Sequence, residues 1–165
     1  MAKNDPMIET RFSEAVMDFL IEIPMFDKVQ ADELKIISRH MNIMDFKKGE
    51  VIFEEGDRGD YVCFIVKGSL DVVKRNERGR YVVLSSLGKG RSIGEMAVID
   101  AFTRSATVKA RTETTLVILT KKDFEDIVDR YPVIGVKILK SISRLLSMNL
   151  RKTSSRLADY MLPLG

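Results

Sequence analysis

The chain between residues 44 and 119 consists of short apolar runs separated by glycine-containing turn sequences. The runs are rich in Val, Ile, Phe and Tyr, which favour strands, and they end in residues that favour tight reversals. The turn sequences are Lys48-Gly49, Gly56-Asp57, Lys67-Gly68, Arg78-Gly79 and Gly88-Lys89-Gly90. Successive short strands joined in this way pack as an antiparallel sandwich or jelly roll, because each buries one face and turns into the next.

Helical periodicity flanks this segment on both sides. Residues 11–21 and 31–41 place apolar side chains at three- and four-residue steps, and residues 121–130 do the same before a break at Tyr131-Pro132. We therefore expect an α+β fold: an antiparallel β-roll (double-stranded jelly roll) with N-terminal helices and a C-terminal helix pair. The expected bounds are 1–43 for the helical lead-in, 44–119 for the roll and 121–162 for the C-terminal helices.

Length and composition predict one domain over residues 1–165. With 165 residues and 45% hydrophobic content, the chain can bury one good core. The single cysteine precludes an internal disulfide, and no N-terminal apolar run follows a basic region. No apolar stretch is long enough to span a membrane. We expect a cytoplasmic protein without membrane association.

An apolar stripe runs along the last predicted helix at alternating three- and four-residue steps, close to a coiled-coil seam. Its members are Leu139, Ile142, Leu146, Leu150, Thr153, Leu157, Tyr160 and Leu164. We expect the first half to pack on the roll and the second half to pair with the same helix of another copy, giving a homodimer. Asp159 is the only acid after residue 130. Such a basic run is usually a solvated face, and an acidic partner or nucleic acid is the alternative.

The segment RSIGEMAVIDAFTRSATVKA, residues 91–110, combines groups that suit a phosphorylated sugar. After Gly94, residues 95–99 can form one helical turn whose N–H groups and positive dipole end attract an anion. Arg104 offers a guanidinium fork for phosphate oxygens, Ser105 a hydroxyl and an N–H, and Glu95 an acceptor for a ribose hydroxyl. Gly-Glu and Arg-Ser pairs are common, however, and a helix–strand junction with an exposed ion pair would have a similar sequence.

The surrounding pattern resembles the cyclic nucleotide-binding domain family, the sensor module of the catabolite activator protein and of protein kinase A regulatory subunits. Residues 46–72 resemble the first half of that family's roll, with glycines at its turn positions, where a Cβ would hinder a tight reversal. These glycines are Gly49, Gly56, Gly59 and Gly68. The family's phosphate-binding cassette falls on residues 93–106, where Ile93 replaces the usual aromatic residue.

The resemblance implies a role for each residue of the cassette. Gly94 and the backbone after Glu95 meet the cyclic phosphate, Glu95 takes the ribose 2′-hydroxyl, and Arg104 neutralises the phosphate. The implied ligand-binding residues of the cassette are Gly94, Glu95, Met96, Ala97, Arg104, Ser105 and Ala106.

The resemblance also implies contacts to the base. Apolar residues that hold the purine fall on Val72, Leu84 and Leu87, which could equally be core residues, and Ser85 falls on a position near the phosphate. In the segment LRKTSSRL, Thr153 and Ser154 match adjacent hydroxyl residues that read the adenine edge, one of them from the opposite subunit. A hydroxyl that bonds back to its own helix is the alternative. These matches favour cyclic AMP and leave cyclic GMP possible, because a hydroxyl both donates and accepts.

The sequence argues against an enzyme and against a metal protein. His40, expected inside the second helix, is the only histidine, and it lies far along the chain from Cys63. No Cys–His or Ser–His pair is therefore indicated, and a histidine-rich metal site is impossible. Cys63 lies in an apolar run and is expected in the core. We expect no catalytic residue, no metal and no cofactor besides the nucleotide ligand.

These observations together predict a cyclic nucleotide sensor that binds cyclic AMP, or cyclic GMP, without altering it. We expect the ligand to reposition the terminal helix and so to change the contact with a downstream protein that the sequence does not identify. We expect no DNA-binding domain, because too few residues follow Tyr160 to build a recognition helix. The alternatives are a sensor fragment of a CRP-type transcriptional regulator without its helix-turn-helix, and a degenerate roll that serves as a protein-interaction or dimerisation module.

Overall fold

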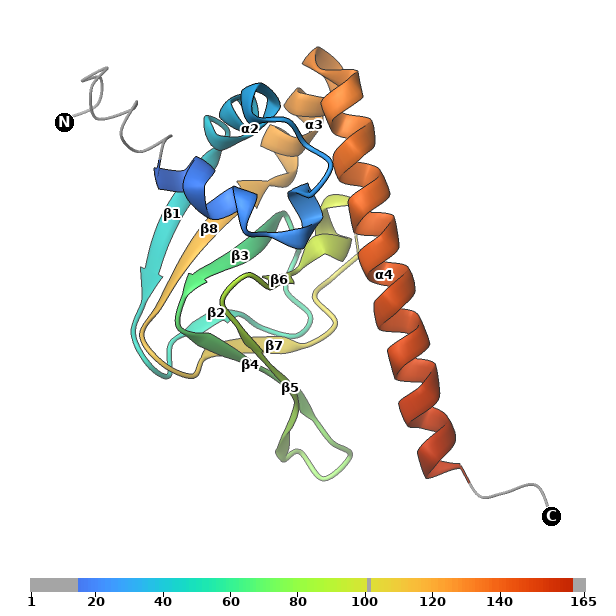
Figure 1. The fold of residues 1–165 in the computed structure, drawn as a ribbon. Helices are drawn as coiled ribbons and strands as arrows, with labels where there is room; N and C mark the ends of the chain where they lie inside the picture. Colours follow the sequence, from blue (N-terminus) through green and yellow to red (C-terminus); the bar gives the residue numbers. More distant parts are fainter. Residues whose placement is uncertain (1–14, 101, 162–165) are drawn as a thin grey trace.

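The computed structural model describes residues 15–100 and 102–161. Within them, two four-stranded antiparallel sheets form a roll, and helices cover one of its sides (Figure 1). The strand orders are β1-β8-β3-β6 in one sheet and β2-β7-β4-β5 in the other. Neighbours in each sheet are mostly not consecutive in the chain, so the strands roll up instead of forming a simple meander. The predicted α+β fold with an antiparallel β-roll is confirmed.

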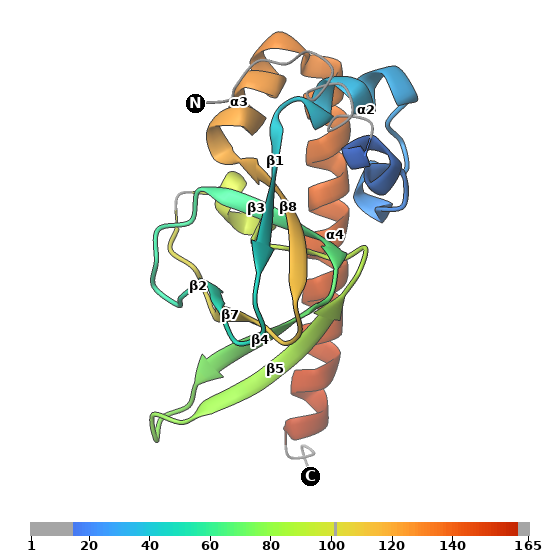
Figure 2. The same ribbon diagram turned by 90° about the vertical axis from the view of Figure 1, so that its left-hand side faces the viewer.

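The strands are short, and each sheet takes segments from both halves of the roll. The first sheet contains β1 (Met41–Phe46), β8 (Thr114–Thr120), β3 (Tyr61–Lys67) and β6 (Ser92–Ile93). The second contains β2 (Val51–Phe53), β7 (Thr107–Ala110), β4 (Ser69–Arg75) and β5 (Tyr81–Gly88). Figure 2 shows β4 and β5 extending together as a long hairpin away from the helices.

The central strands of the first sheet are buried on both faces, not on one as predicted. In β3, Cys63 and Ile65 point into the roll, whereas Val62 and Phe64 pack against the helical layer. Successive side chains of a strand point to opposite faces, so a strand covered on both sides reads as a continuous apolar run. The prediction that Cys63 belongs to the core is confirmed, since its side chain is fully buried.

The helical lead-in is shorter than expected. The chain is helical at residues 15–21, forms a short 3-10 helix η1 (Pro24–Phe26), and continues into α2 (Ala31–Ser38). Residues 11–14 of the first expected helix lie outside the described residues. The second expected helix ends at Ser38, because Met41 pairs with Leu119 at the start of β1 and is buried there. His40 therefore follows the helix, and the roll begins at residue 41 and not at residue 44.

The helices after the roll follow the sequence pattern closely. Helix α3 spans Lys121–Arg130, and the Thr120 hydroxyl caps it by accepting a hydrogen bond of 3.1 Å from the Asp123 N–H. Helix α4 spans Pro132–Tyr160, with Pro132 in its first turn, where the missing N–H has no cost. Gly135 allows the two helices to approach closely, because a Cβ there would lie 2.9 Å from the Val128 Cα.

Helix α4 has two halves with different surroundings. Ile134, Ile138 and Ile142 are buried in the cluster between α4, α3, η1 and the outer face of the first sheet, and Leu139 and Leu146 pack beside them. Every side chain from residue 147 to residue 159 is exposed, including Leu150 and Leu157. The first half of the stripe is therefore buried within the molecule, as predicted, but it packs mainly on α3 and η1, which lie between it and much of the roll. Pairing of the second half stays a prediction. Leu164 lies outside the described residues. No helix in the described part of the chain is long and apolar enough to cross a membrane.

Candidate functional site

A sharp backbone turn at Gly94 opens the cassette. Gly94 follows β6 with φ 85° and ψ 14°, and the chain then forms the 3-10 helix η2 (Glu95–Val98). This left-handed conformation favours glycine, and a Cβ at this position would also collide with the Arg104 Nη1 and lie 3.2 Å from the Tyr61 carbonyl oxygen. Gly94 is therefore required both by the turn and by the close approach of Arg104.

Arg104 lies inside the protein and is held by backbone on several sides. Its side chain is only 5% exposed, and it donates from Nη2 to the Tyr61 carbonyl at 2.8 Å and from Nη1 to the Gly94 carbonyl at 3.3 Å. Its own N–H donates to the Asp57 carbonyl at 2.8 Å, which joins the cassette to the turn after β2. These contacts leave the Nε–H without a partner.

Two aromatic rings enclose the Arg104 guanidinium. Its Cζ lies 4.0 Å from the centroid of the Phe53 ring and 4.5 Å from that of Tyr61. Such cation–π contacts stabilise a partly desolvated guanidinium and fix its plane. The Tyr61 hydroxyl donates to the Ile52 carbonyl at 2.8 Å, and burial raises the pKa of Tyr61. Neither Phe53 nor Tyr61 was predicted as a site residue. Their only sequence signal is that aromatic side chains flank the glycine-rich turn at residues 56–59.

Glu95 is buried beside this arginine without being paired to it. Its side chain is 7% exposed, and its Oε2 has no hydrogen-bond partner. Burial raises the pKa of the Glu95 carboxyl, although the nearby charges of Arg91 and Arg104 oppose the shift. Within the described residues, Glu95 and Arg104 form no ion pair with each other. The site thus contains an unmatched acceptor and an unmatched donor, which is rare among buried groups.

All seven ligand-binding residues predicted in the cassette surround one hollow of about 110 Å³. Of the predicted ligand-binding residues, it is lined by Val72, Gly94, Glu95, Met96, Ala97, Arg104, Ser105 and Ala106. Phe53, Ile93, Phe102 and Val108 contribute further apolar surface. Ligand pockets for whole small molecules usually measure about 300–1,000 Å³. The hollow therefore has room for part of a nucleotide, and the rest would lie on the adjoining surface.

The three β5 residues of the predicted site lie beside the hollow and do not line it. Ser85 is half-buried directly opposite Val72, and a bulge at this point leaves Leu84 without a partner in the ladder and half exposed. Leu87 lies opposite Leu70 and packs against the core between the sheets. The alternative interpretation of Leu87 as a core residue therefore agrees with its position.

The predicted base readers lie elsewhere in this structure. Thr153 and Ser154 are exposed on the second half of α4, and neither lines the hollow. The structure thus brings together the phosphate and sugar side of the predicted site and does not bring the two hydroxyls to it.

Gly59 does not adopt the turn conformation that the sequence predicted for it. Gly49, Gly56 and Gly68 have positive φ angles, as expected for tight reversals, whereas Gly59 does not. A Cβ on Gly59 would instead lie 2.5 Å from the Ala97 Cβ and 3.3 Å from the Arg104 Nε. Gly59 is therefore required because the backbone passes close behind the cassette.

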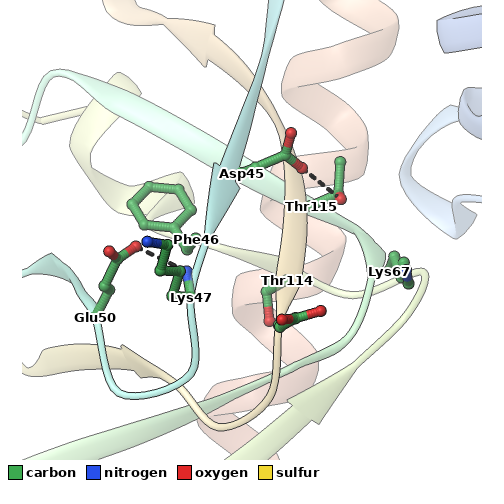
Figure 3. A pocket seen from close by; sticks show the side chains of 8 residues that line it. Asp45, Phe46, Lys47, Glu50, Lys67, Thr114 and Thr115 are labelled. Atoms are coloured by element: carbon green, nitrogen blue, oxygen red, sulfur yellow. Dashed lines mark hydrogen bonds between the residues drawn. The ribbon is translucent and has the colours of Figure 1, made fainter.

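A larger hollow, of about 320 Å³, lies where β1 and β8 meet the following turns (Figure 3). Two hydrogen bonds already join residues of its lining: the Thr115 hydroxyl donates to Asp45 at 2.7 Å, and the Lys47 N–H donates to Glu50 at 2.7 Å. It contains no unmatched buried group of the kind found in the cassette. Nor does any cluster of His, Cys, Asp and Glu in the described part of the chain have the arrangement of a metal site.

Comparisons with known proteins agree with this geometry. The family model described as the cyclic nucleotide-binding domain matches residues 43–131. The chain is 29% identical to a putative potassium channel protein of Rhodopseudomonas palustris, over 87% of this chain and 36% of that protein. It is 25% identical to a CRP-like cAMP-activated global transcriptional regulator of Mycobacterium tuberculosis, over 87% of this chain and 62% of that protein. The chain thus spans only part of the length of these relatives.

A solved structure extends the similarity to most of the fold. A cyclic nucleotide-binding domain from Methylobacillus flagellatus superposes with a TM-score of 0.81 at 25% identity, over 92% of this chain and 85% of that chain. The matched family segment includes the complete cassette and more than half of the sequence. The chain therefore belongs to the cyclic nucleotide-binding domain family.

Proposed function

We propose that this chain is a regulatory domain that binds cyclic AMP, with cyclic GMP as the weaker alternative, and leaves the nucleotide chemically unchanged. The mycobacterial relative is described as cAMP-activated, which supports this choice of ligand. The nucleotide would act as a signal, so the domain needs no catalytic residue.

One observation carries the proposal: the buried Glu95 Oε2 and the buried Arg104 Nε both lack partners beside the same hollow. A cyclic ribose phosphate supplies what each lacks. Its 2′-hydroxyl donates to the carboxylate, and its anionic oxygen accepts from the guanidinium. The backbone at Met96 and Ala97 and the Ser105 hydroxyl would complete the phosphate contacts.

The position of the base follows from the small size of the hollow. With the sugar and phosphate in the cassette, the purine would rest on the neighbouring surface of β4 and β5, near Val72, Leu84 and Leu87. Ser85, opposite Val72, would lie close enough to the phosphate side to add a hydrogen bond. Thr153 and Ser154 would meet the base only after α4 moves or from another copy of the chain.

We further propose that α4 is both the dimer element and the moving element. Its exposed second half carries Leu150 and Leu157, which are 68% and 60% exposed and would be buried by a second copy of the helix. Base contacts that differ between two positions of α4 would shift the equilibrium between them and change the surface offered to a downstream protein. Cytoplasmic location and a single domain over residues 1–165 stay predictions.

Calorimetry with cyclic AMP, cyclic GMP and 5′-AMP tests the ligand. We expect micromolar or tighter binding of cyclic AMP, weaker binding of cyclic GMP and much weaker binding of the linear nucleotide. Absence of binding to either cyclic nucleotide below about 1 mM would contradict the proposal.

Light scattering tests the dimer. The wild-type protein should have twice the mass of the chain. Leu150→Glu should reduce the measured mass to that of one chain, because dimerisation would bury an unpaired carboxylate between the two helices. Arg151→Gln, on the adjacent exposed position, is the control that should remain dimeric. A wild-type protein that stays monomeric at high concentration would contradict dimerisation through α4.

A further inference from the structure

A groove of about 240 Å³ lies on the other side of β6 from the nucleotide hollow. Its walls come from η1, from the turn between β5 and β6, and from α4, which packs against η1 (Figure 1). It is larger than the nucleotide hollow, and it has no part in the function proposed above.

Helix α4 presents one continuous face to this groove. Ser141, Arg144, Leu145 and Met148 line it at positions three, four and seven residues apart, a spacing that places side chains on one side of a helix. Ser141 is only 7% exposed and lines the groove. Its hydroxyl is not one of the buried groups left without a partner in the described residues, so it is accessible from the groove and can donate to a polar ligand group.

The rest of the lining is mostly apolar, and its charged side chains are two arginines and Asp27. Met25 is buried at the η1 side, and Leu145 and Met148 lie opposite on α4. Arg91 is exposed and has neither an ion pair nor a hydrogen bond from its side chain in the described part of the protein. Arg144 forms an exposed ion pair of 3.6 Å with Asp27, which also lines the groove, so the two arginines and the aspartate leave a net positive charge beside the apolar surface. The groove therefore suits a molecule with an apolar body and an anionic head.

The groove and the nucleotide hollow share one short strand. Ser92 of β6 lines the groove, and the next residue, Ile93, lines the nucleotide hollow, since successive side chains of a strand point to opposite faces. Gly94 and Glu95 follow at once. The positive charge of Arg91 also acts on the Glu95 carboxyl, whose pKa it lowers against the effect of burial.

We propose that this groove is a second ligand site, which takes a small amphiphilic anion with an apolar body and a carboxylate or phosphate head. The head lies between Arg91 and Arg144, within reach of the Ser141 hydroxyl, and the body packs on Met25, Leu145 and Met148. Occupancy engages Arg91 and Ser92 on the groove side of β6, whose next residue lines the nucleotide hollow, and it fixes α4 against η1. It therefore changes the affinity for the cyclic nucleotide, a coupling that rests on the proposed function.

Calorimetry on the full chain with octanoate, octyl phosphate and octanol tests the site. We expect the better of the two anions to bind below about 1 mM and octanol at least tenfold more weakly. The double variant Arg91→Gln, Arg144→Gln should weaken anion binding at least tenfold. Arg151→Gln, on the same helix but outside the groove, should leave it unchanged, and thermal unfolding should show that both variants are folded. Absence of binding by both anions, equal binding of octanol, or undiminished binding by the double variant would each overturn the proposal.

The coupling has its own measurement. The dissociation constant for cyclic AMP, measured with and without the saturating anion, should change by at least threefold, and the anion's affinity should change by the same factor when nucleotide is bound. An unchanged constant would overturn the coupling. Failure of the nucleotide to bind at all would count against the proposed function and not against the groove, because anion binding is measured in the absence of nucleotide.

Discussion

Two glutamates of this protein lie beside a basic side chain in poorly exposed surroundings, and they differ in how their oxygens are paired. Glu33, on α2, accepts from the Lys137 Nζ at 2.7 and 2.6 Å and from the Gln30 N–H at 2.7 Å. The Gln30 hydrogen bond, followed by Lys137, lowers the pKa of Glu33. Glu95 has an Oε2 without a partner, and burial raises its pKa.

We interpret this difference as the one between a structural ion pair and the proposed binding site. The Glu33–Lys137 pair is complete, and it ties the helical lead-in to α4 across 104 residues of sequence. The Glu95 and Arg104 groups are incomplete, although each lies inside the protein where a missing hydrogen bond is costly. Under the proposed function, a ligand supplies the hydrogen bonds that these two groups lack. The predictions below test this contrast, from the largest expected effect to the smallest.

Removal of the Arg104 guanidinium should have the largest effect on ligand binding. Arg104→Ala should weaken cyclic AMP binding by about 1.5–3 kcal/mol, or about 10- to 150-fold, because a charged hydrogen-bond network to the phosphate is lost. Arg104→Lys should lose nearly as much, since an ammonium cannot replace the fork held between Phe53 and Tyr61. Calorimetry on folded protein gives both values. Unchanged affinity would place the phosphate elsewhere.

Disruption of the complete pair should affect stability and spare binding. Lys137→Met should lower the free energy of unfolding by about 1–2 kcal/mol, since Glu33 keeps its charge with one partner fewer in a half-buried place. Urea unfolding measures this loss. The matched control is Lys140→Met, an exposed position one turn further along α4, which should change stability by less than about 0.5 kcal/mol. An equal loss of stability in Lys137→Met and Lys140→Met would contradict a structural role of the Glu33–Lys137 pair.

In the ligand-free protein, Glu95 and Glu33 should change the free energy of unfolding in opposite directions as the pH rises. The folded protein holds the Glu95 proton more tightly than the unfolded chain does. This group's contribution to stability is therefore present below the ordinary glutamate pKa of 4.5 and is lost as pH rises through the raised value. Relative to Glu95→Gln, the wild type should lose stability in that interval.

Glu33 should show the opposite trend. Its lowered pKa gives a contribution that is present above 4.5 and is lost as pH falls through the lowered value, so the wild type should lose stability relative to Glu33→Gln on acidification. Urea unfolding of the three proteins over a pH series checks both signs. The same sign for both glutamates would contradict the contrast between a complete and an incomplete site.

The sequence predicts those helices and turns whose ends are set by residues close to them in the chain. Helix α3 begins after a capping Thr120 and ends before Pro132, and both signals can be read without knowledge of the fold. The Gly94 turn and the lining of the hollow by Glu95, Arg104 and Ser105 also followed from a short segment and the family it resembles.

Features that depend on distant partners could not be predicted in this way. Met41 continues the helical periodicity of α2, yet its pairing with Leu119 places it in a strand. Phe53 and Tyr61 enclose a guanidinium 51 and 43 residues further along the chain, and no local pattern marks that contact. Gly59 matches a turn position in sequence, and only the folded chain places Ala97 against it.

The central claim is that Glu95 is left unpaired for a ribose hydroxyl, and a cycle between protein and ligand tests it most directly. Cyclic AMP and 2′-deoxy cyclic AMP are titrated by calorimetry into the wild type and into Glu95→Ala. The wild type should lose about 1–2 kcal/mol, or roughly 5- to 30-fold in affinity, when the 2′-hydroxyl is removed, whereas Glu95→Ala should bind the two nucleotides equally. An equal loss in both proteins would contradict the assignment, because the hydroxyl would then have another partner.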